Sequence, residues 1–319
     1  MIVMGDSRRT RIRIALGERF ADLWLFHGSQ RHVLFDTGVK GTIESALIPA
    51  LRELNIAPEA VEVVVVSHLD VDHSGDIGNV RPLLPKATVI AHEGDAAAMS
   101  DWEVFSSQRG REFREGWGMD EAPGAVEWMR NAFAPGAVDR ILQGEDTLTL
   151  DDGRVLEVWH VPGHTRGHLA LYDVEMRSLA ISDAILGSAV PLADGSPSFP
   201  PTYRHVDAYL GTITRVRELA PETLLTAHYG DFFGPDIMAF LEESESFVHT
   251  LDQAVRNTLS SDGKTLAEIV HETNPVVASW PVEGTQTALA FPVSGHLERM
   301  LAAHEIQRRE SSRGWEWTL

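Results

Sequence analysis

The stretch His68-Leu69-Asp70-Val71-Asp72-His73 places two imidazoles and two carboxylates within six positions. It directly follows residues 61–67, a β-branched and nearly all-apolar segment that predicts a buried strand. Loops at the carboxyl ends of core strands commonly build one wall of a site. Burying these side chains together without a cation would be unfavourable, because the two carboxylates repel each other and all four groups lose their hydration. The stretch therefore predicts a metal site. The alternative is a polar helix start, with Asp72 as N-cap and the histidines exposed.

The composition restricts the donors that such a site can use. The chain has 319 residues, of which 43% are hydrophobic, enough for one large domain and a small one. Cysteine is absent, which excludes thiolate metal sites, disulfides and cysteine nucleophiles. Any metal must therefore be held by His, Asp or Glu.

The charge and the apolar pattern restrict partners and location. Lys and Arg number 27 against 47 Asp and Glu, and the net charge of −20 repels polyanions such as nucleic acids. No apolar segment follows the basic residues near the start of the chain, and no apolar run approaches the ~18 residues of a membrane span. We expect a soluble cytoplasmic protein with a small-molecule substrate, no nucleic-acid or membrane partner, and a homodimer as one arrangement to test.

Strand and helix patterns alternate as far as about residue 234. Helical spacing predicts helices at 41–54, 76–84 and 207–219. Alternating or apolar segments predict a meander over 10–38 and strands at 61–67, 87–91, 147–150, 154–161, 168–172, 179–182 and 223–227. This order indicates an α/β catalytic domain over residues 1–235.

An aromatic-rich segment, residues 93–140, interrupts the strand pattern. Its aromatic side chains occur among many charged residues, and glycines and prolines break the run. We predict two or three short helices that fold over the metal loop as a pocket wall or lid. The alternative is that the aromatics fill a small satellite core.

Residues 236–319 predict a small C-terminal helical domain. Helical patterns cover 236–259 and 292–305, and a capping box, Thr265 with Glu268, opens a helix between them. The tail is expected to form a hairpin around residues 311–314. Three helices and a hairpin suggest a winged-helix arrangement, although helix bundles give similar patterns.

Three further candidate ligands also stand where a predicted strand ends. His164 lies on a Pro-Gly turn after the strand ending at Val161, Asp183 follows the strand at 179–182, and His228 follows Ala227. Each residue is weak evidence for a metal site on its own, because a single histidine after a strand is more often a surface residue. The repeated context of strand, ligand and turn makes the set stronger than its parts.

These residues resemble the metallo-β-lactamase fold superfamily of dinuclear metallohydrolases. The matching pieces are the 68–73 stretch with Gly75, the 162–165 turn, Asp183 and His228. The resemblance implies a four-layer αββα sandwich with two divalent metal ions, zinc foremost, at one edge. It implies that His68, Asp70 and His164 hold one ion, that Asp183 bridges, and that Asp36 braces the loop. The other ion is then held by Asp72, His73 and His228.

Asp70 departs from the family pattern, in which most relatives have a histidine there. The third carboxylate gives the ligands a charge of −3 rather than −2. More oxygen and more negative charge favour harder ions such as iron or manganese, while zinc remains feasible. The departure also leaves open that the first site is weak or differently arranged.

The resemblance implies hydrolysis by a metal-bridged hydroxide, which Asp72 orients. Tyr203 is a candidate donor to the oxyanion, and its alternative role is packing of a proline-rich loop. His92 and His168 are expected to hydrogen-bond behind the ligands. The apolar loop 184–201 and the aromatic insert suit a small ester, lactone or thioester.

Two other functions remain open from the sequence. The winged-helix suggestion raises a nuclease or phosphodiesterase, but nine acids against six bases over residues 251–319 weaken it. A di-iron redox enzyme acting on dioxygen or nitric oxide is the other, because some such superfamily members carry a carboxylate at the position of Asp70. Those members usually carry a flavin-binding module, and we expect no appended domain of that size here.

Overall fold

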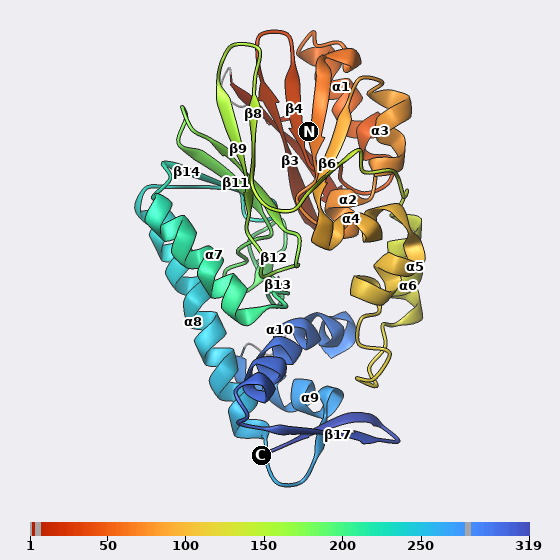
Figure 1. Ribbon diagram of the computed structural model, residues 1–319, viewed down its shortest axis with the longest axis vertical. Helices are drawn as coiled ribbons and strands as arrows, with labels where there is room; N and C mark the ends of the chain where they lie inside the picture. Colours follow the sequence, from red (N-terminus) through yellow and green to blue (C-terminus); the bar gives the residue numbers. More distant parts are fainter. Residues whose placement is uncertain (1, 4–7, 278–281) are drawn as a thin grey trace.

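The computed structural model describes residues 2–3, 8–277 and 282–319, and two facing sheets form its centre (Figure 1). In the first sheet β1 to β4 form an antiparallel meander, and β4 to β7 run parallel. The carboxyl ends of β4, β5 and β6 therefore meet at one edge. The strands of this sheet, in order, are β1 (Ile2–Val3), β2 (Arg9–Leu16), β3 (Arg19–His27), β4 (His32–Phe35), β5 (Val61–Val65), β6 (Thr88–His92) and β7 (Arg140–Leu142).

The second sheet brings its own strand ends to the same side of the molecule. Strands β11 and β14 are parallel, and β9 has the same direction because both β9 and β11 pair antiparallel with β10. Asp183, His228 and the turn that carries His164 thus share one edge. The order is β15 (Asp231–Phe233), β14 (Thr223–Thr226), β11 (Ser178–Ser182), β10 (Leu169–Asp173), β9 (Val155–His160) and β8 (Asp146–Thr149).

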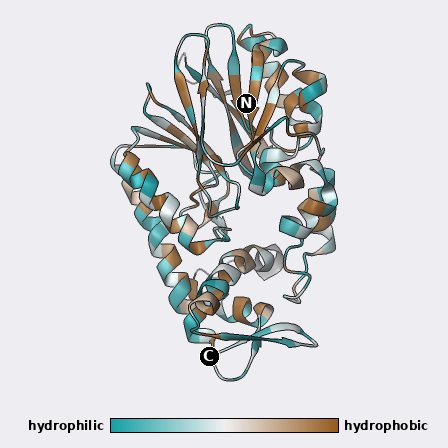
Figure 2. Ribbon diagram, in the orientation of Figure 1, coloured by the Kyte–Doolittle hydropathy of each residue, from teal (hydrophilic) through white to brown (hydrophobic). Residues whose placement is uncertain are grey.

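Helices cover the outer face of each sheet, which confirms the predicted αββα sandwich. The first sheet is covered by a π-helical turn (Ile43–Leu47), α1 (Ile48–Glu53), α3 (Ile77–Leu83) and α4 (Glu93–Ser100). The second is covered by α7 (Val206–Leu219) and α8 (Pro235–Thr258). A third apolar cluster, including Trp24, Phe26 and Leu171, fills the space between the sheets, and Figure 2 shows the apolar residues along these strands.

The aromatic insert forms α5 (Trp102–Phe105), a π-helical turn (Ser106–Gly110) and α6 (Pro123–Asn131) after α4. Its aromatics join the two large apolar clusters rather than a separate satellite core: Phe113 and Trp117 belong to the cluster of the second sheet, and Phe105 and Phe133 to that of the first. Trp117 contacts Trp315 and Trp317 with ring centroids 5.1 and 5.3 Å apart, and Phe113 contacts Phe291 at 4.8 Å. The insert is thereby joined to the C-terminal elements.

The C-terminal segment contains α9 (Leu266–Val277), α10 (Val282–Ala302) and a small sheet of β16 (Lys264–Thr265), β18 (Gly314–Thr318) and β17 (Gln307–Ser311). The expected start of the last helix near Pro292 was wrong. Proline favours a first helical turn, but here Leu289 and Ala290 before it are buried and continue the helix. The apolar cluster runs from β11 through α7 and α8 into α10. The boundary at 235 and the winged-helix assignment therefore remain predictions.

The short strands β7, β15 and the pair β12 (Val190–Pro191) and β13 (Pro197–Phe199) were not predicted, because so few residues show no period. Among the described residues no helix is both long and apolar enough to cross a bilayer.

Candidate metal centre

The 68–73 stretch turns sharply from β5 into a four-residue helix, α2 (Val71–Ser74). Asp70, rather than Asp72, stands at its N-cap position, and its side chain makes no capping hydrogen bond. His68 and His73 are only 0% and 1% exposed. The alternative of a polar helix start with exposed histidines is therefore wrong.

Two histidines are fixed from behind by acceptors on the first sheet. The Nδ1 atom of His73 lies 2.9 Å from Asp36 Oδ2, and that of His228 lies 2.7 Å from the carbonyl oxygen of Phe20. Such partners set the tautomer that leaves Nε2 free, as in metal-binding histidines. Both Nε2 atoms face the centre of the site.

These atoms form a group with the spacing of metal ligands. Asp72, His73 and His228 offer ligand atoms that all lie within 4.8 Å of one another. Asp183 Oδ1 lies 3.7 Å from His73 Nε2 and 3.3 Å from His228 Nε2. Four ligands at zinc–ligand distances of roughly 2.0–2.1 Å would be about 3.3 Å apart in a tetrahedron. The donors therefore fit a divalent ion.

The electrostatics of this group also call for a cation. Burial opposes a charge on His73, but the carboxylates of Asp72 and Asp183 outweigh it and raise the pKa of His73 to about 10. The Nε2 atom of His73 and the Oδ1 atom of Asp183 are buried and lack a hydrogen-bond partner among the described residues. Buried polar atoms are seldom left so, and a shared ion would satisfy both.

The other predicted group is also brought together. His68, His164 and Asp183 offer ligand atoms within 4.8 Å of one another. Nδ1 of His68 is held by Ser67 Oγ at 2.9 Å, and Nδ1 of His164 faces Thr202 Oγ1 at 3.4 Å. Asp70 Oδ2, expected to complete the set, lies 3.1 Å from His164 Nε2 and 3.6 Å from His68 Nε2.

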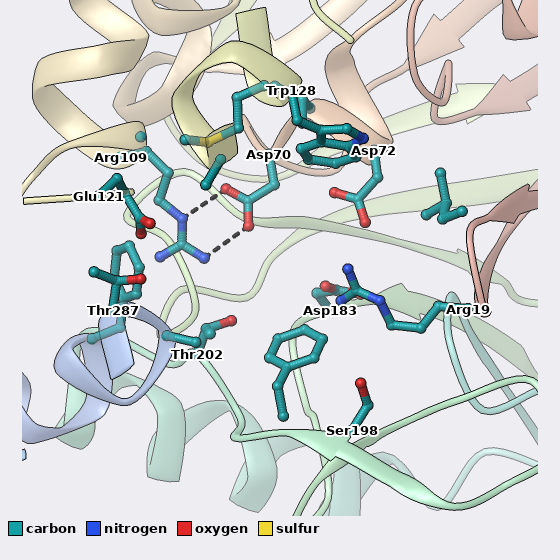
Figure 3. A pocket seen from close by; sticks show the side chains of 18 of the residues that line it. Arg19, Asp70, Asp72, Arg109, Glu121, Trp128, Asp183, Ser198, Thr202 and Thr287 are labelled. Atoms are coloured by element: carbon teal, nitrogen blue, oxygen red, sulfur yellow. Dashed lines mark hydrogen bonds and ion pairs between the residues drawn. The ribbon is translucent and has the colours of Figure 1, made fainter. Parts of the chain in front are cut away.

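Asp70 is also paired with Arg109, a residue that the sequence did not single out. Both carboxylate oxygens accept from the guanidinium, from Nε and Nη2 at 2.7 Å each (Figure 3). Burial alone would raise the pKa of Asp70, but Arg109 and the neighbouring histidines hold it well below its usual range. The pair is neutral overall, so the extra charge that favoured harder ions is cancelled.

Arg109 also reaches the imidazole of His164. Its Nη2 atom lies 3.1 Å from His164 Nε2. Burial and this guanidinium lower the pKa of His164 to about 4, so the ring is neutral near pH 7 and can accept the hydrogen bond at Nε2.

Asp36 has the bracing position that the resemblance implied. Besides His73, its carboxylate accepts from Ser67 N at 2.7 Å, Ser67 Oγ at 2.9 Å and Ser182 Oγ at 3.0 Å. It thereby ties the ends of β4, β5 and β11 together.

Asp95 is a second brace, and sequence reasoning missed it. It is 1% exposed and accepts from Leu69 N, Thr165 Oγ1 and Gly167 N at 3.2, 2.6 and 2.8 Å. It therefore joins the loops that carry His68 and His164. An acid in the first turn of a helix is common for the helix dipole alone, so its position gave no distinct signal.

The histidines expected behind the ligands lie in different places. His168 stacks on His68 with ring centroids 4.5 Å apart, and its Nδ1 lies 3.0 Å from the carbonyl oxygen of Leu169. His92 caps α4 by accepting from Gly94 N and stacks on His160 at 3.9 Å. Only His168 contacts a candidate ligand.

These strand-end ligands belong to a chain whose residues 16–228 match the model of the metallo-beta-lactamase superfamily. The chain belongs to this superfamily. It is a hydrolase, as its sequence predicted.

Relatives agree with this superfamily assignment. "Acyl-coenzyme A thioesterase MBLAC2" of Homo sapiens is 28% identical over 230 residues, which cover 66% of this chain and 74% of that protein. A metallo-beta-lactamase family protein of Thermus thermophilus superposes with a TM-score of 0.73 at 23% identity, covering 97% and 96% of the two chains. A beta-lactamase domain protein of Burkholderia ambifaria gives 0.72 at 16% identity over 99% and 93%. The two structures show a shared fold.

Asp72, Asp183 and His228 of the candidate metal group line a cavity of about 520 Å³. Figure 3 shows Asp70, Asp72 and Asp183 facing it. The insert supplies one wall, as predicted. The lining includes Phe105, Arg109, Glu121, Trp128 and Met129 from the insert, Thr287 and Phe291 from α10, Arg19 from β3, and Leu192, Ser198 and Phe199 from the 184–201 loop.

Tyr203 does not line this cavity. It is fully buried, stacks on Tyr209 at 4.6 Å and has its hydroxyl 2.9 Å from His296 Nε2. The structure thus places it in the packing role, and the neighbouring Thr202 lines the cavity instead. The expected oxyanion donor is not brought to the site.

His205, beside the centre, should make stability depend on pH. Burial, and then the guanidinium of Arg204, lower its pKa to about 4. Between pH 6.5 and 4 the unfolded chain therefore takes up a proton that the folded chain does not, and stability falls as pH falls. We expect His205→Gln to flatten this dependence in chelator-treated protein, measured by urea unfolding at pH 7, 6, 5 and 4.5. Parallel curves for the two proteins would contradict the assignment.

Proposed function

We propose that this superfamily member is a metal-dependent hydrolase of a thioester. The observation that carries the proposal is the cavity itself, which is lined by aromatic side chains and by the Asp72, Asp183 and His228 donors, with His73 next to them. An apolar acyl chain suits such walls. The relatives named acyl-coenzyme A thioesterase support a thioester over an ester or lactone.

Asp72, His73, His228 and Asp183 are the residues that would hold a divalent ion. We propose zinc, with iron or manganese as alternatives, because imidazole and carboxylate donors suit all three. Such an ion, when bound, lowers the pKa of water and polarises a carbonyl. An ion at His68, Asp70 and His164 with Asp183 bridging, as the resemblance implied, would compete with Arg109 for Asp70 and His164.

Residues of the chain account for the remaining steps. Asp72 has a side chain 22% exposed toward the cavity, so its carboxylate can orient the attacking water and accept its proton. His73 and His228 flank Asp72 and keep it in place. Phe105, Trp128 and Phe291 exclude bulk water from the reacting carbonyl.

An activity panel tests the proposal directly. Purified protein would be assayed with acyl-thioesters of increasing chain length, aryl esters, lactones and a bis-aryl phosphodiester, and its metal content measured. We expect thioester hydrolysis to be fastest and to disappear on chelation, returning with zinc. Turnover of the phosphodiester alone would favour the nuclease alternative, and an iron-loaded protein consuming dioxygen would favour the redox one.

Location and partners follow the same proposal. We propose a cytoplasmic enzyme acting on a small molecule without a nucleic-acid partner, which the net charge of −20 supports. Cell fractionation and sizing of the purified protein test the location and the homodimer.

A further inference from the structure

A guanidinium contacts two of the four donors that the resemblance assigns to the first ion. The four donors expected there are His68 Nε2, His164 Nε2, Asp70 Oδ2 and Asp183. Arg109 Nη2 lies 2.7 Å from Asp70 Oδ2 and 3.1 Å from His164 Nε2. These two atoms are themselves 3.1 Å apart. One amino group of Arg109 therefore hydrogen-bonds to two of the four atoms that such an ion would use.

The two donors that Arg109 does not contact explain why ion binding at this position is expected to be weakened rather than abolished. His68 Nε2 and Asp183 Oδ1 have no hydrogen-bond partner among the described residues, so they can still face an ion. Asp183, however, also belongs to the neighbourhood of His73 and His228. An ion at this position could therefore bind His68 and share Asp183, but Asp70 and His164 are already hydrogen-bonded to Arg109.

The charge of Arg109 also weakens the binding of an ion at this position. A divalent ion held by His164 and Asp70 would lie within a few ångströms of the permanently charged guanidinium, which repels it. Arg109 also neutralises the carboxylate that would otherwise attract the ion.

Arg109 is held firmly enough to act in this way. It is 7% exposed, and its guanidinium carbon lies 4.0 Å from the ring centroid of Phe291 on α10. The bidentate geometry to Asp70 adds a planar match that a lysine would lack. Displacing it would leave a cation and Asp70 unpaired in a largely buried place.

We propose that the Arg109 guanidinium takes the place of the first ion, so that this chain binds one divalent ion tightly and a second far more weakly. The tight position is that of Asp72, His73, His228 and Asp183. The inference rests on the metal centre of the proposed function. It assigns Asp70 to holding Arg109 rather than to holding metal.

Zinc titration of the wild-type protein tests this without any mutation. Chelator-treated full-length chain would be titrated with zinc chloride against a chromophoric chelator, and zinc counted after dialysis. We expect one zinc per chain, with the second binding about 100-fold more weakly or worse. Two ions of similar affinity would overturn the inference.

Variants then assign the effect to Arg109. Arg109→Met removes the charge and keeps the length, so Asp70 and His164 become free and the second zinc should bind about 100-fold more tightly. Arg109→Lys keeps a charge and should stay near one zinc. Arg111→Met is the matched control, because Arg111 pairs with Asp120 on the outer side of the same insert. It should leave the stoichiometry unchanged.

The outcomes separate this inference from the proposed function. A wild-type protein that binds no zinc contradicts the metal centre itself. A protein that binds one zinc but gains no second in Arg109→Met contradicts only the inference. If Arg109→Met fails to fold, Arg109→Met with Asp70→Asn removes both charges together, and the second zinc should still bind more tightly than in wild type.

Discussion

Asp183→Asn should lower kcat/KM by about 1,000-fold or more, the loss expected when a group holding a catalytic ion is removed. Asp183 is the carboxylate that lies in reach of both candidate groups, and the amide has the same shape but no charge. We expect zinc per chain to fall with activity. His73→Ala should act alike, because its Nε2 is an unpaired donor at the centre. The measurements are steady-state kinetics and metal analysis.

The control for this prediction lies on the loop that follows Asp183. Asp194 is exposed and binds Ser196 at the tip of the 184–201 loop, so Asp194→Asn should leave activity and zinc unchanged. Circular dichroism would show whether the variants fold. Wild-type turnover in both Asp183→Asn and His73→Ala would refute the metal centre.

Much of the sandwich could be predicted because it depends on local pattern. The apolar run at 61–67 gave β5, and the alternation at residues 10–38 gave three strands of the first sheet. The ligands were found because each follows a strand, and strand ends of one direction gather at one edge. This step needed no knowledge of side-chain packing.

The pairs that modify the site are distant along the chain and have no local signal. Arg109 lies 39 positions from Asp70, in an insert with several other arginines, and nothing in the sequence marks it as the buried one. Tyr203 was misplaced for the same reason. Its partner His296 lies 93 positions away on α10, whose packing against α7 the sequence does not reveal.

Asp36→Asn should weaken zinc binding by about 10- to 100-fold, the usual cost of removing a partner behind a metal-binding histidine. The carboxylate holds the Nδ1 atom of His73 and the ends of three strands from a site that is 1% exposed. Asparagine tolerates the positive φ of 70° at this position and keeps an acceptor oxygen, so the backbone should stay in place. What is lost is the charge that makes His73 a better donor to the metal.

Competition between the protein and a chelator measures this affinity, and activity at high zinc separates affinity from catalysis. We expect kcat/KM of Asp36→Asn to recover toward wild type when zinc is in excess, because the ligands themselves are intact. Asp151→Asn is the matched control, since the Asp151 carboxylate likewise accepts backbone hydrogen bonds, from Ser29 N and Gln30 N, but on an exposed turn. Equal zinc affinities for Asp36→Asn and Asp151→Asn would show that the brace behind His73 does not set the strength of the centre.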